Sequence, residues 1–327
     1  MPEQWNHKVF GVNEAGFEAL ALEVFRFQSL NSPVYRDYLG ALNINPATVT
    51  SLEKIPFLPV RFFKSHTVQT TSFEPAAIFE SSGTTGSINS RHLVKDLSLY
   101  EESFTTAFQL FYGPVIEWCI IGLLPSYLER KGSSLVYMVD RLIQISEHPQ
   151  SGFYLNENEQ LFTLLTELEK RNQKTLLIGV TFALLDFAAQ YPQLLQHTVV
   201  METGGMKGRR EEMIRPQVHE LLKIAFQLPA IHSEYGMTEL LSQAYSKGDG
   251  IFTCPSWMKI LVRDEEDPFL VKRTGSGTIN VIDLANIYSC SFIATDDIGK
   301  IQPDGSFGVL GRIDGSDLRG CSLMVAL

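Results

Sequence analysis

The pattern of apolar and polar positions changes along the chain, and its first part predicts helices. Residues 14–30 carry apolar side chains close to helical spacing, at Phe17, Leu20, Leu22, Val24, Phe25 and Leu30. Residues 55–66 contain two prolines among several aromatic residues. Each proline removes a backbone donor and disfavours a helical turn before it. We therefore expect a helical N-terminal region followed by an extended segment packed on the core.

From residue 76 onward, short apolar runs alternate with amphipathic stretches. The apolar runs, which are typical of buried strands, cover residues 76–80, 117–125, 174–182 and 197–203. Residues 158–173 place apolar side chains on one helical face, and residues 210–228 predict a second helix with a kink at Pro216. Strands that alternate with helices indicate an α/β fold with a mostly parallel, doubly wound sheet covered on both faces.

After residue 250 the pattern becomes that of strands separated by tight turns. Apolar runs recur within residues 256–268, 276–285, 290–301 and 304–313, and Gly or Asp residues stand between them. The Pro303-Asp304-Gly305 triplet is a strong turn signal. This pattern predicts an antiparallel, β-rich lobe.

Composition and charge narrow the function classes. The chain has 327 residues, 44% of them hydrophobic, which is enough for one large domain or two modest ones. A net charge of −10 argues against a broad basic face for nucleic acid. The four cysteines form no Cys-x-x-Cys pair, which argues against a disulfide framework or a structural zinc site. No signal core and no membrane-spanning apolar run is present, so we expect a cytoplasmic protein with reduced thiols.

A run of hydroxyl and glycine residues follows the first predicted strand of the α/β region. It reads Ser81, Ser82, Gly83, Thr84, Thr85 and Gly86. Glycines let backbone N–H groups turn inward, and the hydroxyl groups add donors, so the run suits a triphosphate. It is not a Walker A loop, because no Gly-Lys-Ser/Thr follows at the required spacing. Taken alone, the run is equally compatible with a flexible polar turn.

A second candidate is the segment 232–239, which reads HSEYGMTE. Tyr235 could stack on a base, and Gly236 would allow close approach of a ligand. Thr238 offers a hydroxyl group, and Glu239 could bind a magnesium ion that bridges phosphates. The alternative is a surface turn in which the threonine caps a helix.

A third candidate is the pair Asp297 and Arg312 within residues 295–317. A carboxylate can accept hydrogen bonds from ribose hydroxyls, and the planar guanidinium fork suits ribose or phosphate. The alternative is that both residues belong to a simple β-hairpin.

In this order, the motifs resemble those of the adenylate-forming superfamily of acyl-CoA synthetases, adenylation domains and firefly-type luciferases. The resemblance spans roughly residues 55–320. It implies that residues 81–86 bind phosphate, that Gly204, Gly205 and Met206 in ETGGM line adenine, and that YGMTE holds the aromatic and magnesium residues. It further implies an N-terminal domain of that superfamily over residues 1–312, with a β-rich lobe at about 250–312. A hinge and short tail, 313–327, would replace the usual small C-terminal domain.

The closer resemblance is to LuxE-type acyl-protein synthetases, through IPFLPVRFFKS, FESSGTTGSINSRH, ETGGMKG, FIATDDIGKI and GSDLRGCSLM. It implies ATP and Mg²⁺ as cofactors, activation of a fatty acid to acyl-AMP, and transfer of the acyl group to the thiol of Cys321. It also implies an acyl-reductase or acyl-carrier partner. His232 could lie near the acyl carbonyl, or it could be a structural histidine whose hydrogen bonds are satisfied within the protein. Two features depart from the superfamily pattern. Arg91 and His92 would replace an expected phosphate-binding lysine, and we expect no C-terminal domain with its catalytic lysine.

Two alternatives stay open. The chain could instead deliver acyl-AMP to coenzyme A or a carrier protein, or it could be a non-catalytic nucleotide-binding or acyl-binding subunit. The apolar surroundings of Cys321 in CSLMVAL are also compatible with an ordinary buried cysteine. Cys119, inside WCIIGLL, is expected to lie in the core.

Overall fold

The computed structural model describes residues 2–81, 88–124, 132–155, 157–204 and 213–313. These residues form two compact units. Unit 1 comprises the described residues of 1–107, 236–244 and 253–316, and unit 2 comprises those of 108–235 and 245–252.

Unit 1 begins with three helices: α1 (Pro2–Phe10), α2 (Glu14–Asn31) and α3 (Pro33–Ala41). The side chain of Asn13 caps α2 by accepting a hydrogen bond from the Gly16 N–H. The predicted helical face is buried at Phe17, Leu20, Val24 and Phe25, whereas Leu30 is 72% exposed. The last turn of α2 carries Leu30 out of the core.

The proline-rich segment of unit 1 is extended in its first half only. Two short 3-10 turns, Pro46–Thr48 and Leu52–Lys54, lead into β1 (Leu58–Pro59), which runs parallel to β14 (Phe292–Ile301). A short helix, α4 (Phe62–Ser65), then follows. The sequence prediction missed α4. The helix can form because both prolines precede it and therefore remove none of its hydrogen bonds.

The predicted β-rich lobe is confirmed and belongs to unit 1. Its strands are β11 (Met258–Arg263), β12 (Val271–Lys272), β13 (Gly275–Asp283), β14 and β15 (Phe307–Arg312), with the 3-10 turn Leu284–Asn286 after β13. They are ordered β12-β11-β13-β14-β15, and each neighbouring pair is antiparallel. The predicted turn is present, with Gly305 at a φ of 84°. A separate antiparallel pair consists of β2 (Ala77–Glu80) and β3 (Arg91–Val94).

Unit 2 contains the predicted parallel sheet. Strands β4 (Cys119–Leu123), β5 (Gly152–Phe153), β6 (Thr175–Gly179), β7 (Thr198–Glu202) and β8 (His232–Tyr235) pair in parallel in the order β5-β4-β6-β7-β8. The order continues from β8 to β9 (Ala244–Ser246) and β10 (Ile251–Thr253). Every residue of β4 and β6 is buried, as expected for a parallel sheet covered on both faces.

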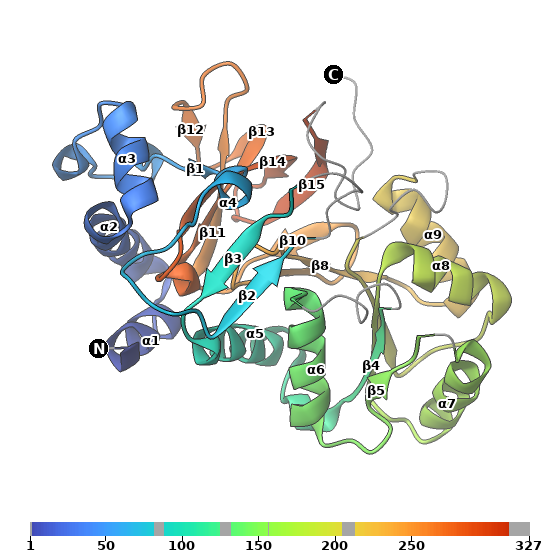
Figure 1. Cartoon of the computed structure of the whole chain (residues 1–327). Helices are drawn as coiled ribbons and strands as arrows, with labels where there is room; N and C mark the ends of the chain where they lie inside the picture. The colour runs from blue at the N-terminus through green and yellow to red at the C-terminus, as the bar shows by residue number, and fades with distance from the viewer. Residues whose placement is uncertain (1, 82–87, 125–131, 156, 205–212, 314–327) are drawn as a thin grey trace. The chain divides into compact units, whose positions relative to one another are not determined.

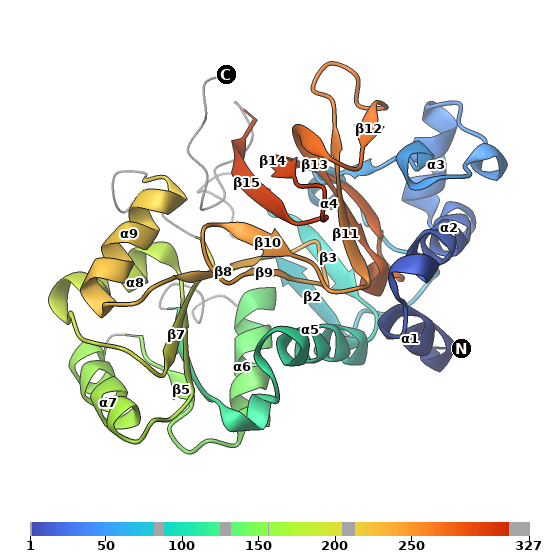
Figure 2. The ribbon, with the colours of Figure 1, turned by 180° about the vertical axis from the view of Figure 1, so that it is seen from behind.

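Helices cover both faces of the sheet of unit 2. They are α6 (Ser134–Ser146), α7 (Asn158–Lys170), α8 (Thr181–Gln190) and α9 (Arg215–Phe226). The chain enters β4 from α5 (Leu97–Tyr112) through the 3-10 turn Val115–Glu117. Figures 1 and 2 show α6 on one face of the sheet and α7 on the other. Pro216 does not kink a helix as we expected. It lies in the first turn of α9, where its missing N–H costs nothing.

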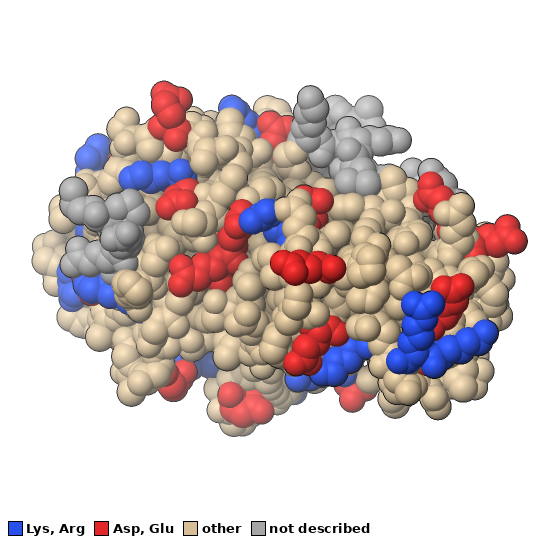
Figure 3. Space-filling model, turned by 90° about the horizontal axis from the view of Figure 1, so that it is seen from below, with Lys and Arg blue, Asp and Glu red and all other residues tan. Residues whose placement is uncertain are grey.

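The surface carries charges of both signs. On the face shown in Figure 3, acidic and basic side chains are interspersed among uncharged ones. None of the helices in the described ranges is both long and apolar enough to cross a bilayer.

Candidate functional site

The base of the Ser/Thr/Gly run is fixed by a hairpin in unit 1. The Ser81 N–H donates to the Ser90 carbonyl at 3.1 Å, and the Ser90 N–H donates to Ser81 Oγ at 2.9 Å. The run therefore connects two paired strands, β2 and β3, which argues against a linker between domains. Ser82, Gly83, Thr84, Thr85 and Gly86 lie outside the described residues.

The Thr238–Glu239 backbone is held by a buried polar pair. His92 Nδ1 lies 2.8 Å from the Thr238 carbonyl oxygen, and His92 Nε2 lies 2.9 Å from Asn286 Oδ1. Asn286 Nδ2 in turn donates to the Glu239 carbonyl at 2.7 Å. Burial lowers the pKa of His92. The ring is fully buried and not exposed as a phosphate ligand in a solvated loop would be, and it positions this turn.

The chain that follows Glu239 is anchored by a buried carboxylate. Asp283 accepts from the Leu241 N–H at 2.7 Å, from the Ser242 N–H at 3.1 Å and from Ser242 Oγ at 2.5 Å. Burial raises the pKa of Asp283 to about 6 in spite of these donors. Glu239 itself is fully buried. The segment 238–242 is therefore held at its start by His92 and Asn286 and at its end by Asp283.

Asp297 and Arg312 lie opposite each other on β14 and β15 of unit 1. Arg312 Nε donates to Asp297 Oδ1 at 2.8 Å, and both residues are buried. Such a charge-assisted bond orients both groups. The two residues that the sequence paired for ribose are thus brought together by strand register.

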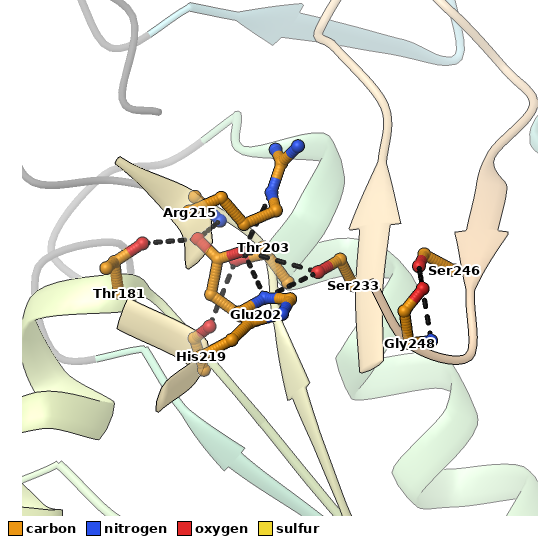
Figure 4. Close-up of polar contacts among 10 residues, drawn as sticks. Thr181, Glu202, Thr203, Arg215, His219, Ser233, Ser246 and Gly248 are labelled. Atoms are coloured by element: carbon orange, nitrogen blue, oxygen red, sulfur yellow. Dashed lines mark hydrogen bonds and ion pairs between the residues drawn. The ribbon is translucent and has the colours of Figure 1, made fainter. Parts of the chain in front are cut away.

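In unit 2, the start of the ETGGM segment is held by the side chain of Glu202. Gly204 adopts a φ of 82°, a backbone conformation that favours glycine. Its N–H donates to Glu202 Oε1 at 2.8 Å, and Thr181 Oγ1 donates to the same oxygen. Figure 4 shows Thr181 pointing toward the carboxylate of Glu202. Gly205 and Met206 lie outside the described residues.

The other oxygen of Glu202 faces positive and polar groups from α9 and β8. Glu202 Oε2 lies 3.7 Å from Arg215 Nε, 4.0 Å from His219 Nε2 and 3.5 Å from Ser233 Oγ. Only 1% of Glu202 is exposed, so its charge depends on these partners. Burial and the neighbouring charge of Glu202 raise the pKa of Glu234 to about 8.

His232 and Tyr235 lie on β8 in unit 2. His232 Nδ1 is 3.2 Å from Tyr112 Oη, and burial, then Lys247 and His219, lower the pKa of His232 to about 4. Tyr235 is buried, and its ring contacts Phe252 edge-on at a centroid distance of 5.9 Å.

The predicted residues therefore divide between the units. Unit 1 contains Ser81, Gly236, Thr238, Glu239, Asp297 and Arg312, and unit 2 contains Gly204, His232 and Tyr235. Cys321, like the glycine-rich loop, lies outside the described residues, so its role stays a prediction.

Sequence reasoning missed the polar residues that hold the candidates in place, namely Glu202, Asp283 and Asn286. Their only sequence signal is a polar residue within or directly after an apolar strand, in VVMET and in NVIDLAN. Such a residue must find a partner once it is buried.

The carboxylate of Glu239 suits magnesium delivered with a nucleotide better than a resident metal. No group of three or more metal-ligating side chains occurs among the residues that the structure describes. Mg²⁺ typically takes one or two protein carboxylates together with substrate phosphates. The single carboxylate of Glu239 matches that donor set.

Comparisons with known proteins identify the fold. No protein-family model matches the sequence, and no curated protein sequence matches it. The structure is similar to ATP-bound MatB from Rhodopseudomonas palustris, with a TM-score of 0.55 and 18% identity, covering 86% of this chain and 58% of that one. It is also similar to 2-hydroxyisobutyryl-CoA ligase in complex with 2-HIB-AMP and CoA, with a TM-score of 0.66 and 14% identity, covering 92% and 68%.

These similarities concern the fold, because the identities are low. The chain spans 58% of the length of the MatB chain it matches. A parallel, helix-covered sheet followed by an antiparallel lobe is the architecture shared with these proteins. The chain therefore has the fold of the large N-terminal domain of adenylate-forming enzymes.

Proposed function

We propose that this protein activates a carboxylic acid, in particular a fatty acid, with ATP to give acyl-AMP and pyrophosphate. The observation that carries the proposal is the buried pair of Asp297 and Arg312, joined at 2.8 Å in the same unit as the fixed Thr238–Glu239 turn. The fold adds support, since its neighbours include one bound to ATP and one bound to an acyl adenylate.

The proposal gives each candidate one task. Backbone N–H groups of residues 82–86 hold phosphates, and Glu239 holds magnesium with help from Thr85 or Thr238. Asp297 and Arg312 bind the ribose. Gly204 and Gly205 with the ring of Tyr235 bind adenine.

The first step needs orientation and charge neutralisation more than covalent help. A carboxylate oxygen attacks the α-phosphorus, a new P–O bond forms, and the bond to pyrophosphate breaks. A magnesium ion bound with ATP would offset the phosphate charge. The protein groups contribute by fixing the reactants, and buried donors such as Arg312 are already oriented before the reaction begins.

The second step is transfer of the acyl group to a thiol, for which we propose Cys321. The thiolate attacks the acyl carbonyl, a thioester forms, and AMP leaves with the electron pair of the broken C–O bond. Burial raises the pKa of Cys119 to about 11 and of Cys290 to about 12, and it also raises the pKa of Cys254. These three thiols are therefore poor nucleophiles near neutral pH, which leaves Cys321 as the best candidate. As we expected, Cys119 is in the core.

We extend the proposal to a cytoplasmic protein that works with an acyl reductase or an acyl carrier. The described cysteines are free thiols, which suits a reducing compartment. A thioester on the protein would need a reaction that consumes it, such as reduction of the acyl group.

Intact-protein mass spectrometry after incubation with ATP, Mg²⁺ and a panel of fatty acids tests the proposal. The expected result is a mass increase equal to one acyl group, which is absent from Cys321→Ser and unchanged in Cys119→Ser. Pyrophosphate release without protein labelling, together with acyl-CoA formation when coenzyme A is added, would assign coenzyme A as the acceptor instead. Absence of acid-dependent pyrophosphate release would contradict the enzymatic function and favour a binding subunit.

A further inference from the structure

Unit 1 contains a hollow of about 600 Å³ that the candidate site does not use. It is bounded by the segment from α3 to α4, the β11–β12 hairpin and β14, whose labels can be followed in Figure 1. Its wall is mainly apolar and includes Leu42, Ile44, Val49, Phe57 and Phe269. Small-molecule sites typically measure about 300–1,000 Å³ and combine an apolar wall with a few polar groups.

The hollow lies on the opposite face of β14 from the proposed ribose pair. Asp296 lines the hollow, whereas its neighbour Asp297 bonds Arg312. Successive side chains of a strand point to opposite faces, so the two carboxylates serve different surroundings. Occupancy of the hollow therefore requires no displacement of the Asp297–Arg312 pair.

Two of the charged groups around the hollow, Glu53 and Arg263, are bonded within the protein. Glu53 is bonded to Arg273, which lowers the pKa of Glu53 to about 2. Arg263 donates to the Ile279 carbonyl at 3.0 Å and to Asn280 Oδ1 at 2.6 Å. Burial lowers the pKa of Arg263, and the nearby charge of Asp296 offsets part of this effect.

Two cations at the rim remain available for a ligand. Arg61 and Lys54 line the hollow and are exposed, and within the described ranges neither forms an ion pair. The charge of Arg61 also opposes the ionised form of Arg263. An anion bound at Arg61 would reduce this repulsion, whereas a cation there would increase it.

We propose that the hollow is a binding site for an amphiphilic carboxylate. Its apolar chain or ring system packs along Phe57, Val49 and Leu42, and its carboxylate is bound by Arg61 and Lys54 at the rim. The carboxylate is the part that selects the ligand, because the apolar wall alone would accept an alcohol of the same length equally well.

Isothermal titration of the whole chain with decanoate tests this site. To keep the proposed catalytic site occupied, titrations are repeated with saturating 5′-O-(decanoylsulfamoyl)adenosine, a stable analogue of an acyl adenylate. We expect one saturable decanoate site that persists in the presence of the analogue. Arg61→Ala is expected to weaken it by about tenfold, and 1-decanol is expected to bind at least about tenfold more weakly than decanoate, since each loses a charge-assisted hydrogen bond.

Two further variants complete the design. Val271→Trp places a large ring at the half-buried rim of the hollow and should abolish the decanoate site. Arg36→Ala removes an exposed arginine that does not line the hollow and should leave decanoate binding unchanged. The proposal is overturned if wild type binds no decanoate, or if the analogue removes all decanoate binding. It is also overturned if Arg61→Ala binds decanoate as tightly as wild type does, or if wild type binds 1-decanol as tightly as decanoate. Failure of the analogue to bind would count against the proposed function and not against the hollow.

Discussion

Replacement of Glu202 by alanine is expected to lower the free energy of unfolding by about 3–5 kcal/mol, because it breaks a buried ion pair by removing one partner. The carboxylate is 1% exposed and accepts from the Gly204 N–H at 2.8 Å and from Thr181 Oγ1. Arg215 Nε lies 3.7 Å away, and the Arg215 side chain is 15% exposed.

The magnitude follows from the groups left behind. Each buried donor that loses its acceptor costs about 1–3 kcal/mol, and the Gly204 N–H and the Thr181 hydroxyl both lose theirs. The Arg215 charge loses its nearest carboxylate as well. Entry of water into the vacated space would recover part of this cost, so the sum is an upper limit. Glu202→Gln keeps the shape and one acceptor oxygen, and it should cost roughly half as much.

The assay is urea denaturation of the full chain followed by circular dichroism, with a separate fit for each transition if the units unfold separately. The matched control is Glu167→Ala, which removes an exposed glutamate from the same unit. Glu167 Oε2 lies 3.9 Å from Arg171 Nη2. The control should change stability by less than about 0.5 kcal/mol. A change below about 1 kcal/mol in Glu202→Ala would refute the view that this carboxylate organises the start of the ETGGM segment.

Three other predictions concern polar groups that are partly or fully buried. The pKa of Glu234 is raised to about 8, so the folded state binds this proton more tightly than the unfolded state, and wild type loses stability as pH rises from about 4.5 to 8. The urea midpoint of Glu234→Gln should fall less over that pH range than the midpoint of wild type. An equal fall of the midpoint in the two proteins would contradict the assignment. The pKa of His232 is lowered to about 4, so wild type loses stability as pH falls from about 6.5 to 4; ¹H–¹⁵N NMR titration should show a neutral ring at pH 6, and an imidazolium there would disprove it. Trp257 is 1% exposed and its Nε1–H faces two serine hydroxyls at 3.0 and 3.1 Å; Trp257→Phe should cost about 1–3 kcal/mol in thermal unfolding, and an unchanged melting temperature would show that these contacts contribute little.

Periodicity was a good guide to the elements, and its errors arose at their ends. The parallel strands were predicted because burial on two faces leaves continuous apolar runs, and the antiparallel lobe was predicted because tight Gly and Asp turns separate its strands. Pro216 was predicted to kink a helix, but it lies in the first turn of one. The apolar pattern around a proline is the same whether the proline begins the helix or interrupts it. The helix Phe62–Ser65 was missed because a single turn is too short to show a period.

The site was harder to predict than the fold because its support is non-local. Sequence motifs named Asp297 and Arg312, and strand register brought them together. The contact between His92 and Asn286 joins residues 194 positions apart, and no local pattern indicates it. His92 therefore looked like an exposed phosphate ligand, although it is a buried support for the Thr238–Glu239 turn.

Acid-dependent exchange of radioactive pyrophosphate into ATP tests the central claim most directly, because exchange requires reversible formation of an acyl adenylate and does not depend on the final acceptor. With a fatty acid present, wild type should catalyse exchange, Cys321→Ser should retain it, and Asp297→Ala should lose most of it. If wild type shows no exchange above background with any acid of the panel, the chain does not form adenylates and the proposed function is wrong.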